Sequence, residues 1–274
     1  MREPLPAGDA AALRQVAERV AGEAAEHLRA LSPSARAEVM TKSSPTDLVT
    51  AADTAVEALL RRRLAELRPG DAVVGEEAGG AAGASGTTWV VDPIDGTVNF
   101  RNGLPWYAVS VAAARDGTTV AGAVAEPASG RMWSAAAGAG ATCDGRPLRV
   151  SSRTDVALAV VGTGFAYRAE RRVRQARMVA ALLPRVGDIR RAGSAALDIC
   201  AVAAGWLDAY LEHGTNWWDW AAAAVIAQEA GAVLRTPTAG PAEDGLGADA
   251  MFAAAPGIAA ELAALAAACG AGEV

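Results

Sequence analysis

Apolar residues recur every three to four positions near the start of the chain and predict two helices there. The first helix is expected over residues 9–31, and its apolar face is formed by Leu13, Val16, Val20 and Leu28. A polar, turn-prone stretch separates it from a second helix, expected over about residues 50–67. Pro69 and Gly70 should end the second helix, because neither residue continues a helix well.

Short apolar runs bounded by turn residues predict strands in the middle of the chain. The run "AVVGEEAGG" is typical of a short buried strand that enters an acidic loop, and residues 88–91 form a second apolar run. Between about residues 106 and 150, Asp-Gly and Ser-Gly turns separate four runs: "WYAVSVAAA", "TVAGAVAEP", "RMWSAAA" and "PLRVS". This spacing predicts an antiparallel meander.

After residue 155 the helix and strand patterns alternate. "ALAVVGTGF" predicts a strand, and "AERRVRQARMVAALLPRV" predicts a basic helix. "SAALDICAVAAGWLDAYL" and "WDWAAAAVIAQEAGAVL" each predict a helix that leads into a strand, and the alanine-rich tail predicts a terminal helix. We therefore expect an α/β chain built from two halves, residues 1–150 and 151–274, that meet at a shared cleft within one compact unit.

The composition limits the classes of partner. The chain has 274 residues, a hydrophobic fraction of 52% that is largely alanine, and a formal net charge of −6. This length permits a large buried core. The acidic balance argues against nucleic acid as the main partner, because phosphate backbones favour a basic surface. Small anionic substrates stay possible, since a bound metal ion supplies positive charge locally.

The cysteines and the two ends of the chain predict a cytoplasmic location. Three widely spaced cysteines without a CxxC pair fit a reducing compartment, and fit neither a disulfide framework nor a zinc cluster. The first twenty residues contain acids and no apolar segment of the kind found in signal peptides. The tail holds Pro256, Glu261 and few large apolar residues, which argues against a membrane partner.

The segment "WVVDPIDGTVNF" carries two aspartates directly after the apolar run 88–91. Asp92 should lie at the carboxyl end of this strand, where open α/β sheets bind ligands. Pro93 fixes its own φ angle and restricts Asp92 to an extended backbone. Because Asp95 follows three residues later, one short loop should hold both carboxylates.

The same loop offers further atoms to a ligand. Gly96 and Thr97 should begin a helix, whose free amide groups can bind an anion. The backbone carbonyl of Ile94 and the two carboxylates are hard oxygen ligands of the kind that Mg²⁺ favours. A purely structural alternative is a helix cap, with Asp95 or Thr97 as the N-cap residue.

Two further acidic positions have a similar setting. Glu76 and Glu77 follow an apolar run in "GEEAGG", although an exposed Glu-Glu pair is common and alone indicates only a solvated loop. Asp219 opens an apolar helix, where it could serve as an N-cap. Tryptophans on both sides of Asp219 should bury it in part, and a buried charge needs a partner.

Together, the acids at strand ends and helix starts predict an all-oxygen site for two or three Mg²⁺ ions. Such a site can activate water and hold a phosphoryl group for in-line attack. The sequence has only two histidines, His27 and His213, so a histidine-based zinc site is not expected.

Other phosphatase chemistries fit the sequence less well. Enzymes of the haloacid-dehalogenase type need Asp-x-Asp, whereas the two aspartates here enclose two residues. Residues 143–149 match Cys-x5-Arg, but Asp144-Gly145 predicts a hairpin turn in place of a glycine-rich cradle. No P-loop pattern occurs. The basic stretch 168–177 is expected to be a solvated helix face.

Three segments in this order and spacing resemble the inositol monophosphatase family of Mg²⁺-dependent, lithium-sensitive phosphatases: "GEE", "WVVDPIDGTVNF" and "WWDWAAAAVIAQEAGA". "KSSPTDLVTAAD" and "RRAGSAALDICAVAAGWLDAYLE" extend the likeness over most of the chain. The resemblance implies a layered αβαβα fold, as in inositol monophosphatases and fructose-bisphosphatases, and a homodimer. Most metal ligands would then lie in the N-terminal half, and Asp219 with the substrate wall in the C-terminal half.

The resemblance also implies residue roles. The metal ligands would be Glu76, Asp92, the Ile94 carbonyl, Asp95 and Asp219. Thr97, oriented by Asp53, would position the attacking water, and Glu76 would lie near a weaker third ion. The substrate and its phosphate would contact Asp95, Gly96, Thr97, Gly193, Ser194, Ala195, Glu212 and Asp219. Lys42 would lie in a mobile loop near the metals.

The expected function is Mg²⁺-dependent hydrolysis of a small polyol phosphate, with myo-inositol 1-phosphate as the first candidate substrate. A histidinol-phosphate phosphatase, or another small sugar or nucleotide phosphate monoesterase of this fold, is the alternative. Trp220 and Ala223, where the family's pattern differs, bear on that choice. A non-catalytic interaction protein is the other class, and the retention of all five side chains at positions 76, 92, 95, 97 and 219 favours the enzyme.

Overall fold

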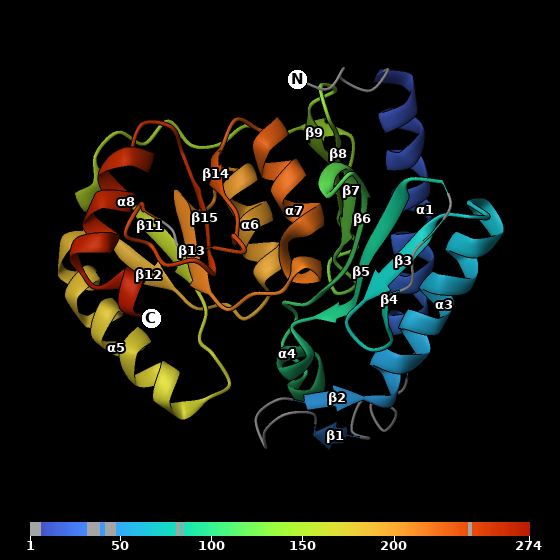
Figure 1. Cartoon of the computed structure of the whole chain (residues 1–274), viewed down its shortest axis with the longest axis horizontal. Helices are drawn as coiled ribbons and strands as arrows, with labels where there is room; N and C mark the ends of the chain where they lie inside the picture. Colours follow the sequence, from blue (N-terminus) through green and yellow to red (C-terminus); the bar gives the residue numbers. More distant parts are fainter. Residues whose placement is uncertain (1–6, 32–38, 42–47, 81–82, 84, 241–242) are drawn as a thin grey trace.

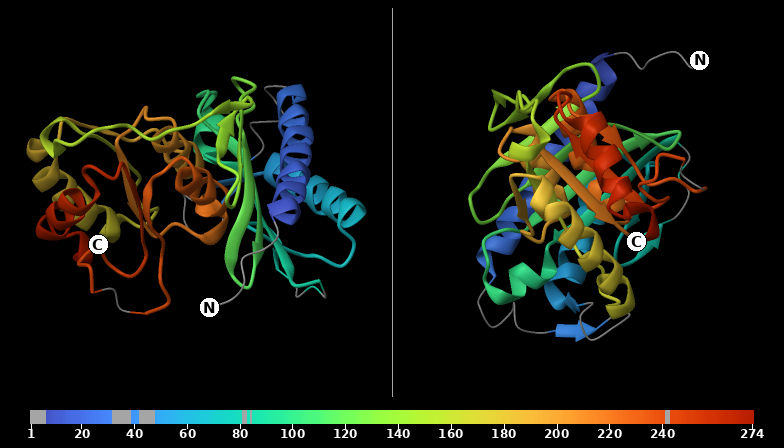
Figure 2. Two further views of the ribbon diagram at one scale, coloured as in Figure 1. Left: turned by 90° about the horizontal axis from the view of Figure 1, so that it is seen from above. Right: turned by 90° about the vertical axis from the view of Figure 1, so that its left-hand side faces the viewer.

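Two β-sheets and three layers of helices make up the fold of the computed structural model (Figures 1 and 2). The structure describes residues 7–31, 39–41, 48–80, 83, 85–240 and 243–274. Helices α1 and α3 cover the outer face of the first sheet, and α5 and α8 cover the outer face of the second. Helices α6 and α7 fill the space between the sheets. The expected αβαβα layering is therefore confirmed.

The first sheet has eight strands in the order β10-β9-β8-β7-β6-β5-β3-β4. In chain order these strands are β3 (Ala72–Gly75), β4 (Gly79–Gly80), β5 (Thr87–Asp95), β6 (Ala108–Arg115), β7 (Thr118–Ala125), β8 (Met132–Ala136), β9 (Ala141–Cys143) and β10 (Arg146–Pro147). Strands β5 to β10 pair antiparallel in sequence, which confirms the predicted meander. Only β3 runs parallel to β5.

The second sheet has five strands in the order β12-β11-β13-β15-β14. They are β11 (Val160–Thr163), β12 (Asp188–Arg190), β13 (Ala209–His213), β14 (Val233–Arg235) and β15 (Ala250–Ala254). A separate two-stranded pair is formed by β1 (Val39–Thr41) and β2 (Leu48–Thr50). The division of the chain into halves at residue 150 stays a prediction, although the two sheets lie on either side of that residue in the sequence.

The helices agree with the periodicity of the sequence. They are α1 (Ala7–Ala30), α3 (Ala51–Leu67), α4 (Thr97–Asn102), α5 (Ala169–Leu182), α6 (Ala195–Ala203), α7 (Trp217–Glu229) and α8 (Ala259–Ala268). Single 3-10 turns occur at η1 (Val156–Leu158), η2 (Leu183–Arg185) and η3 (Ala271–Glu273). No helix in the described part of the chain is both long enough and apolar enough to cross a bilayer.

Both faces of the first sheet are buried, which explains its uninterrupted apolar runs. On β5, Trp89 and Val91 pack with α1 and α3, whereas Val90 packs with α6 and α7. The layer between the sheets consists mainly of alanine, and residues 221–227 of α7 are all buried. Small side chains bring α7 close to the sheet. A Cβ atom on Gly122 of β7 would lie only 2.8 Å from the Ala222 Cα atom.

One strand prediction and one helix prediction were wrong in their extent. The run "PLRVS" contributes only its first residue, Pro147, to β10, because the Leu148 amide then donates to the Ala141 carbonyl and the Val150 amide to the Ala230 carbonyl. The predicted terminal helix begins only at Ala259. The preceding run forms β15, whose five residues are buried between β13 and β14.

The contact between Gly122 and α7 leads to a stability prediction. Gly122→Ala should lower the free energy of unfolding by about 1–3 kcal/mol, because the added methyl group must push α7 away from β7. Denaturant unfolding followed by circular dichroism measures this change.

Gly22→Ala in α1 is the matched control. Its Cβ atom would meet the Met132 Cε atom at an ordinary 3.5 Å, so stability should be unchanged or slightly raised. Equal stability of the two variants would contradict the proposed tight contact.

Candidate active site

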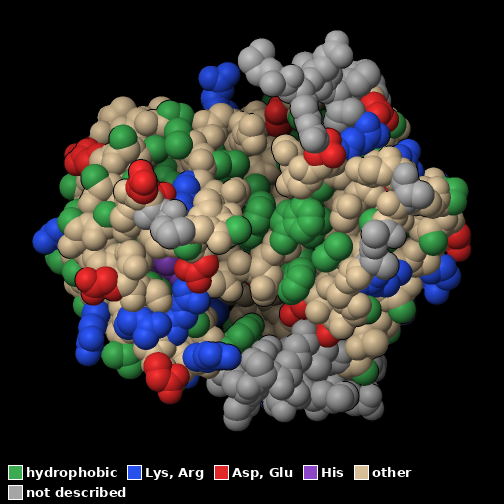
Figure 3. Space-filling view, viewed as in Figure 1, with side chains coloured by type: hydrophobic (Ala, Val, Ile, Leu, Met, Phe, Trp, Pro, Cys, Tyr) green, Lys and Arg blue, Asp and Glu red, His purple; other side chains and the backbone are tan. Residues whose placement is uncertain are grey.

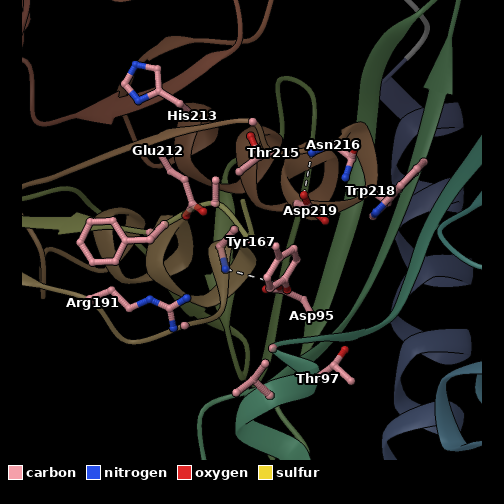
Figure 4. A pocket seen from close by; sticks show the side chains of 18 of the residues that line it. Asp95, Thr97, Tyr167, Arg191, Glu212, His213, Thr215, Asn216, Trp218 and Asp219 are labelled. Carbon is pink, nitrogen blue, oxygen red and sulfur yellow. Dashed lines mark hydrogen bonds between the residues drawn. The ribbon is translucent and has the colours of Figure 1, made fainter. Parts of the chain in front are cut away.

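One cavity of about 550 Å³ lies where the end of β5 and the start of α4 face β11, β13 and the start of α7 (Figure 4). Eight residues selected from the sequence line it: Glu76, Asp95, Gly96, Thr97, Gly193, Ala195, Glu212 and Asp219. They come from segments more than a hundred residues apart. The structure therefore brings most of the predicted site together in one place.

Four further predicted residues in the described part of the chain are not among those that line the cavity: Asp53, Asp92, Ile94 and Ser194. Asp92 and Ser194 are each 1% exposed. The carbonyl of Ile94 accepts a hydrogen bond from the Thr97 hydroxyl, at 3.0 Å. Lys42 lies outside the described residues.

A β-bulge presents the two aspartates of β5. Asp92 pairs with Ser110 and Asp95 pairs with Ala108, so β5 has one more residue than β6 between these pairs. The strand therefore runs through both aspartates, and they do not lie in a loop after it as predicted from the sequence. Pro93 has no amide hydrogen to donate to a neighbouring strand. A bulge tolerates it because the sheet's hydrogen bonding is already interrupted there. The amide of Ile94 donates to Asp92 Oδ1 at 3.0 Å.

The start of α6 holds the carboxylate of Asp95. Oδ2 accepts hydrogen bonds from the Ser194 hydroxyl and from the Ala196 amide at 2.7 Å, and Oδ1 accepts from the Ala195 amide at 3.3 Å. Burial raises the pKa of Asp95 to about 7, although these hydrogen bonds lower it. This contact joins the first sheet to the helix layer between the sheets.

Thr97 and Asp53 lie together, as the resemblance implied. Thr97 begins α4 after Gly96, whose φ of +95° is left-handed and whose missing side chain leaves room for the Gly193 carbonyl. The Thr97 hydroxyl lies 3.2 Å from Asp53 Oδ1 and 3.0 Å from the Ile94 carbonyl oxygen. Asp53 is fully buried in the first turn of α3. The water-positioning role of the pair stays a prediction.

Asp219 lies at the third position of α7, and Asn216 is the N-cap residue. Asp219 Oδ2 accepts a hydrogen bond from the Asn216 amide at 2.6 Å and completes a capping box. The suggested N-cap role of Asp219 is therefore wrong: Asn216 is the N-cap, and the carboxylate of Asp219, three residues later, reaches back to the Asn216 amide. Trp218 lines the cavity, whereas Trp220 is absent from the described lining residues.

The carboxylates at this end of the cavity repel one another. Burial and the charges of Glu76, Asp95 and Asp219 raise the pKa of Asp92 well above its ordinary value. Burial and the charges of Asp95 and Glu76 do the same for Asp219. Ionised acids placed so closely need a cation.

The donor set fits a hard divalent cation such as Mg²⁺, because it consists of carboxylate and carbonyl oxygens. Among the described residues, no three acidic, histidine or cysteine side chains already form a ready metal-binding group. The oxygens of Asp92, Asp95 and Asp219 accept backbone hydrogen bonds instead. We therefore expect a bound cation to reorient some of these three carboxylates.

The loop that carries Glu76 is held by a residue that the sequence analysis missed. Glu57 of α3 is 2% exposed, and its carboxylate accepts hydrogen bonds from the amides of Glu77 at 2.7 Å and Ala78 at 3.0 Å. Both amides directly follow Glu76. Glu57 lies one helical turn after Asp53 on α3, and this spacing is the signal that could have identified it.

Arg61 fixes the carboxylate of Glu57 in turn. Its Nε atom donates to Glu57 Oε1 at 2.8 Å, and its Nη1 atom donates to the Val73 carbonyl of β3 at 3.2 Å. Gly75 leaves the necessary space, since a Cβ atom there would lie 2.6 Å from the Glu57 carboxylate carbon. The direction of the Glu76 loop therefore depends on this buried ion pair.

The opposite wall of the cavity carries charges that the sequence analysis did not assign to a site. Arg168 and Arg171 belong to the stretch expected to be a solvated helix face, and both line the cavity, as does Arg191. Arg172, Arg174 and Arg177 are exposed as expected. Helix α5 thus turns one part of its basic stretch toward the cavity.

The structure gives no support to cysteine chemistry at residues 143–149. Cys143 ends β9, and Asp144 and Gly145 have φ angles of 50° and 76°, which form the predicted hairpin turn. Burial raises the pKa of the Cys143 thiol to about 11, so the thiolate needed for attack is not favoured. All three cysteines are free.

Comparison with known proteins gives consistent matches over nearly the whole chain. The profile of the inositol monophosphatase family matches residues 9–270. Inositol-1-monophosphatase of Mycobacterium leprae is 52% identical, with 93% of each chain covered. Human inositol monophosphatase 1 is 40% identical over 74% of this chain and 76% of its own. The solved structure of Mycobacterium tuberculosis SuhB superposes with a TM-score of 0.80 at 48% identity, covering 95% of this chain and 98% of that one.

The Glu57 contacts predict a loss of cation affinity in Glu57→Gln. The amide group cannot accept from both loop amides and from Arg61, so the Glu76 loop should lose its fixed direction. We expect the Mg²⁺ concentration for half-maximal thermal stabilisation to rise about tenfold or more. Differential scanning fluorimetry across a Mg²⁺ titration measures this.

Glu66→Gln is the matched control on the same helix. Glu66 lies near the end of α3, is half exposed and pairs with Arg63, so its loss should leave the titration unchanged. An unchanged midpoint in Glu57→Gln would show that Glu57 does not position the loop.

Proposed function

Because the chain belongs to the inositol monophosphatase family, whose members depend on metal ions, we propose that it hydrolyses inositol 1-phosphate to inositol and phosphate. It is thus a phosphatase, a phosphoric monoester hydrolase. One observation supports the proposal beyond the family: three carboxylates of the proposed metal site (Glu76, Asp95 and Asp219) line the same cavity as Thr97 and Glu212. The Thr97 hydroxyl lies 3.2 Å from the buried Asp53 carboxylate.

Mg²⁺ is the proposed cofactor, with two or three ions per site. Its ligands would be Glu76, Asp92, the Ile94 carbonyl, Asp95 and Asp219. When bound, the ions would offset the charge of the carboxylates and phosphate and lower the pKa of water. Without such ions, a phosphate dianion would meet several carboxylates at this end of the cavity and be repelled.

Thr97 and Asp53 would orient the attacking water. If the Thr97 hydroxyl donates its hydrogen to the buried Asp53 carboxylate, its oxygen lone pairs are left to accept a hydrogen bond from water. Asp53 therefore sets the direction of the hydroxyl. The resemblance also assigns Glu76 to this step, near the third ion.

The alcohol part of the substrate would lie against the wall formed by Gly193, Ala195 and Glu212. A carboxylate such as that of Glu212 accepts hydrogen bonds from ring hydroxyls, and the Tyr210 hydroxyl and packing on Gly164 hold Glu212 in place. The Ala195 amide already donates to Asp95, so its contact with substrate would require that bond to be shared.

Histidinol phosphate and other small sugar or nucleotide phosphates stay as alternative substrates. Homodimer formation and a cytoplasmic location are proposals that rest on the resemblance and on composition, and light scattering in solution tests the first. A non-catalytic role is disfavoured, since the whole proposed ligand set is retained.

A phosphate-release panel tests the substrate. With Mg²⁺ present, inositol 1-phosphate should be hydrolysed with a kcat/KM at least about tenfold above that of histidinol phosphate, and Li⁺ should inhibit the reaction. A higher kcat/KM for histidinol phosphate would contradict the inositol assignment and identify the chain as a histidinol-phosphate phosphatase. Full hydrolysis in excess chelator would contradict the metal requirement.

The variant Asp92→Asn should lose phosphatase activity without losing stability. The asparagine can keep the hydrogen bond from the Ile94 amide while it removes one charge from the buried cluster. The variant should lose turnover by a factor of about 1,000 or more, as expected when a metal-centred electrostatic group is removed. Phosphate release measures this loss.

The same variant should unfold in metal-free buffer at the wild-type temperature or above, because less repulsion is buried. Added Mg²⁺ should raise the Tm of the wild type and leave that of the variant nearly unchanged. Near-wild-type turnover in the variant would refute the metal assignment of Asp92.

A further inference from the structure

Two neighbouring strands of the second sheet carry glycines and large polar residues at matching positions. Strand β11 and the residue after it contain Gly162 and Gly164, and β13 contains Tyr210 and Glu212. Gly162 lies opposite Tyr210 in this parallel pair, so Gly164 comes opposite Glu212 where the strands end. Since side chains two residues apart share one face of a strand, the sheet places Tyr210 and Glu212 on the same face.

The two glycines leave the space that these side chains occupy. A Cβ atom on Gly162 would lie 3.2 Å from Tyr210 Cδ2, and a Cβ atom on Gly164 would overlap the Glu212 carboxylate. The Tyr210 side chain is fully buried in the core between the sheets, whereas Glu212 is only partly buried and lines the cavity. The glycines of β11 therefore fix the placement of both side chains.

The Tyr210 hydroxyl occupies one oxygen of the Glu212 carboxylate, because it donates a hydrogen bond to Oε2. Burial and the charge of Glu212 raise the pKa of Tyr210 well above its ordinary value, so the hydroxyl keeps its proton and acts as the donor. Within the described chain Oε1 accepts no hydrogen bond, which leaves it for a ligand. In Figure 4 the Glu212 side chain extends from β13 toward the side of the cavity that Asp95 and Arg191 occupy.

Positive charges near Glu212 favour its ionised form. Burial raises the pKa of Glu212, whereas the Tyr210 hydroxyl and the charges of Arg191 and Arg171 lower it. Figure 3 shows further basic side chains beside the central hollow, over the region where Figure 1 places α5. An ionised carboxylate only accepts hydrogen bonds, so Glu212 is suited to bind the hydroxyl groups of a neutral alcohol.

We propose that Tyr210 is a positioning residue for substrate selection: its hydroxyl holds Glu212 so that Oε1 accepts hydrogen bonds from hydroxyl groups of the alcohol. The inference rests on the proposed function, since it concerns the alcohol part of the phosphate ester. Tyr210 is fully buried and is not among the described residues that line the cavity, so it acts through Glu212. A carboxylate without this hydrogen bond would rotate and weaken the contact, because a hydrogen bond depends on the direction of its acceptor.

Tyr210→Phe tests the proposal, because it removes the hydroxyl and keeps the ring. The KM for inositol 1-phosphate should rise about fivefold and kcat should change less than about twofold, since the weakened contact lies on the part of the substrate that does not react. For 4-nitrophenyl phosphate, whose nitrophenyl group carries no hydroxyl, the KM should stay at its wild-type value. Steady-state phosphate release at saturating Mg²⁺ measures both substrates.

A double-mutant cycle shows whether Tyr210 acts through Glu212. Glu212→Ala should raise the KM for inositol 1-phosphate at least as much as Tyr210→Phe does. Adding Tyr210→Phe to Glu212→Ala should then raise the KM no further, because the carboxylate that the hydroxyl holds is already absent.

Tyr107→Phe is the control for the loss of a hydroxyl from a buried tyrosine. Tyr107 is 5% exposed, contacts Phe100 with ring centroids 5.1 Å apart and is not among the described residues that line the cavity. The KM values of this variant should therefore match those of the wild type for both substrates.

Three results would overturn the inference. In the first, Tyr210→Phe keeps the wild-type KM for inositol 1-phosphate. In the second, its KM rises equally for both substrates, as expected of a general structural defect. In the third, the rise persists when Glu212→Ala is already present. If the wild type does not hydrolyse inositol 1-phosphate at all, the proposed function fails and this inference fails with it, which is a distinct outcome.

Discussion

The burial of several carboxylates in one place is the constraint on which the rest of this structure depends. Asp92 and Asp95 are 1% and 8% exposed, and burial raises the pKa of both. A folded chain tolerates such a cluster only where hydrogen bonds or a cation offset the repulsion. Backbone amides supply part of that offset: the bulge of β5 turns one toward Asp92, α6 directs two at Asp95, and the start of α7 holds Asp219.

The alanine-rich layer between the sheets makes this arrangement possible. Asp95 belongs to the first sheet, whereas Ser194 and α6 belong to the layer behind it, so their contact requires close packing. Alanine side chains in α6 and α7, and Gly122 in the sheet, allow the helices to approach the strands closely. The high alanine content therefore serves the site as well as the core, because larger side chains would separate the groups that hold Asp95.

Much of the fold could be predicted, and the errors have physical reasons. Helices α1, α3, α5 and α7 and the meander follow from local periodicity, which the sequence displays directly. The strand β15 was missed because its short run of small apolar residues fits a buried strand or a helix equally well. Glu76, Asp92, Asp95 and Asp219 could be selected because these acids follow apolar runs or open a helix. The resemblance to the family supplied Asp53, Glu212 and the residues of the substrate wall. Their roles in metal and substrate binding remain predictions.

The sequence by itself determined the order of the elements, the burial of β5 on both faces and the spacing that places Asp92, Asp95 and Thr97 at one end of it. Only the tertiary structure decided that Glu57 holds the Glu76 loop and that Arg191 lines the same cavity as the carboxylates. The physical reason is distance along the chain. Local periodicity and turn chemistry act over a few residues, whereas these contacts join groups from about twenty to about a hundred residues apart, whose meeting depends on how whole layers pack.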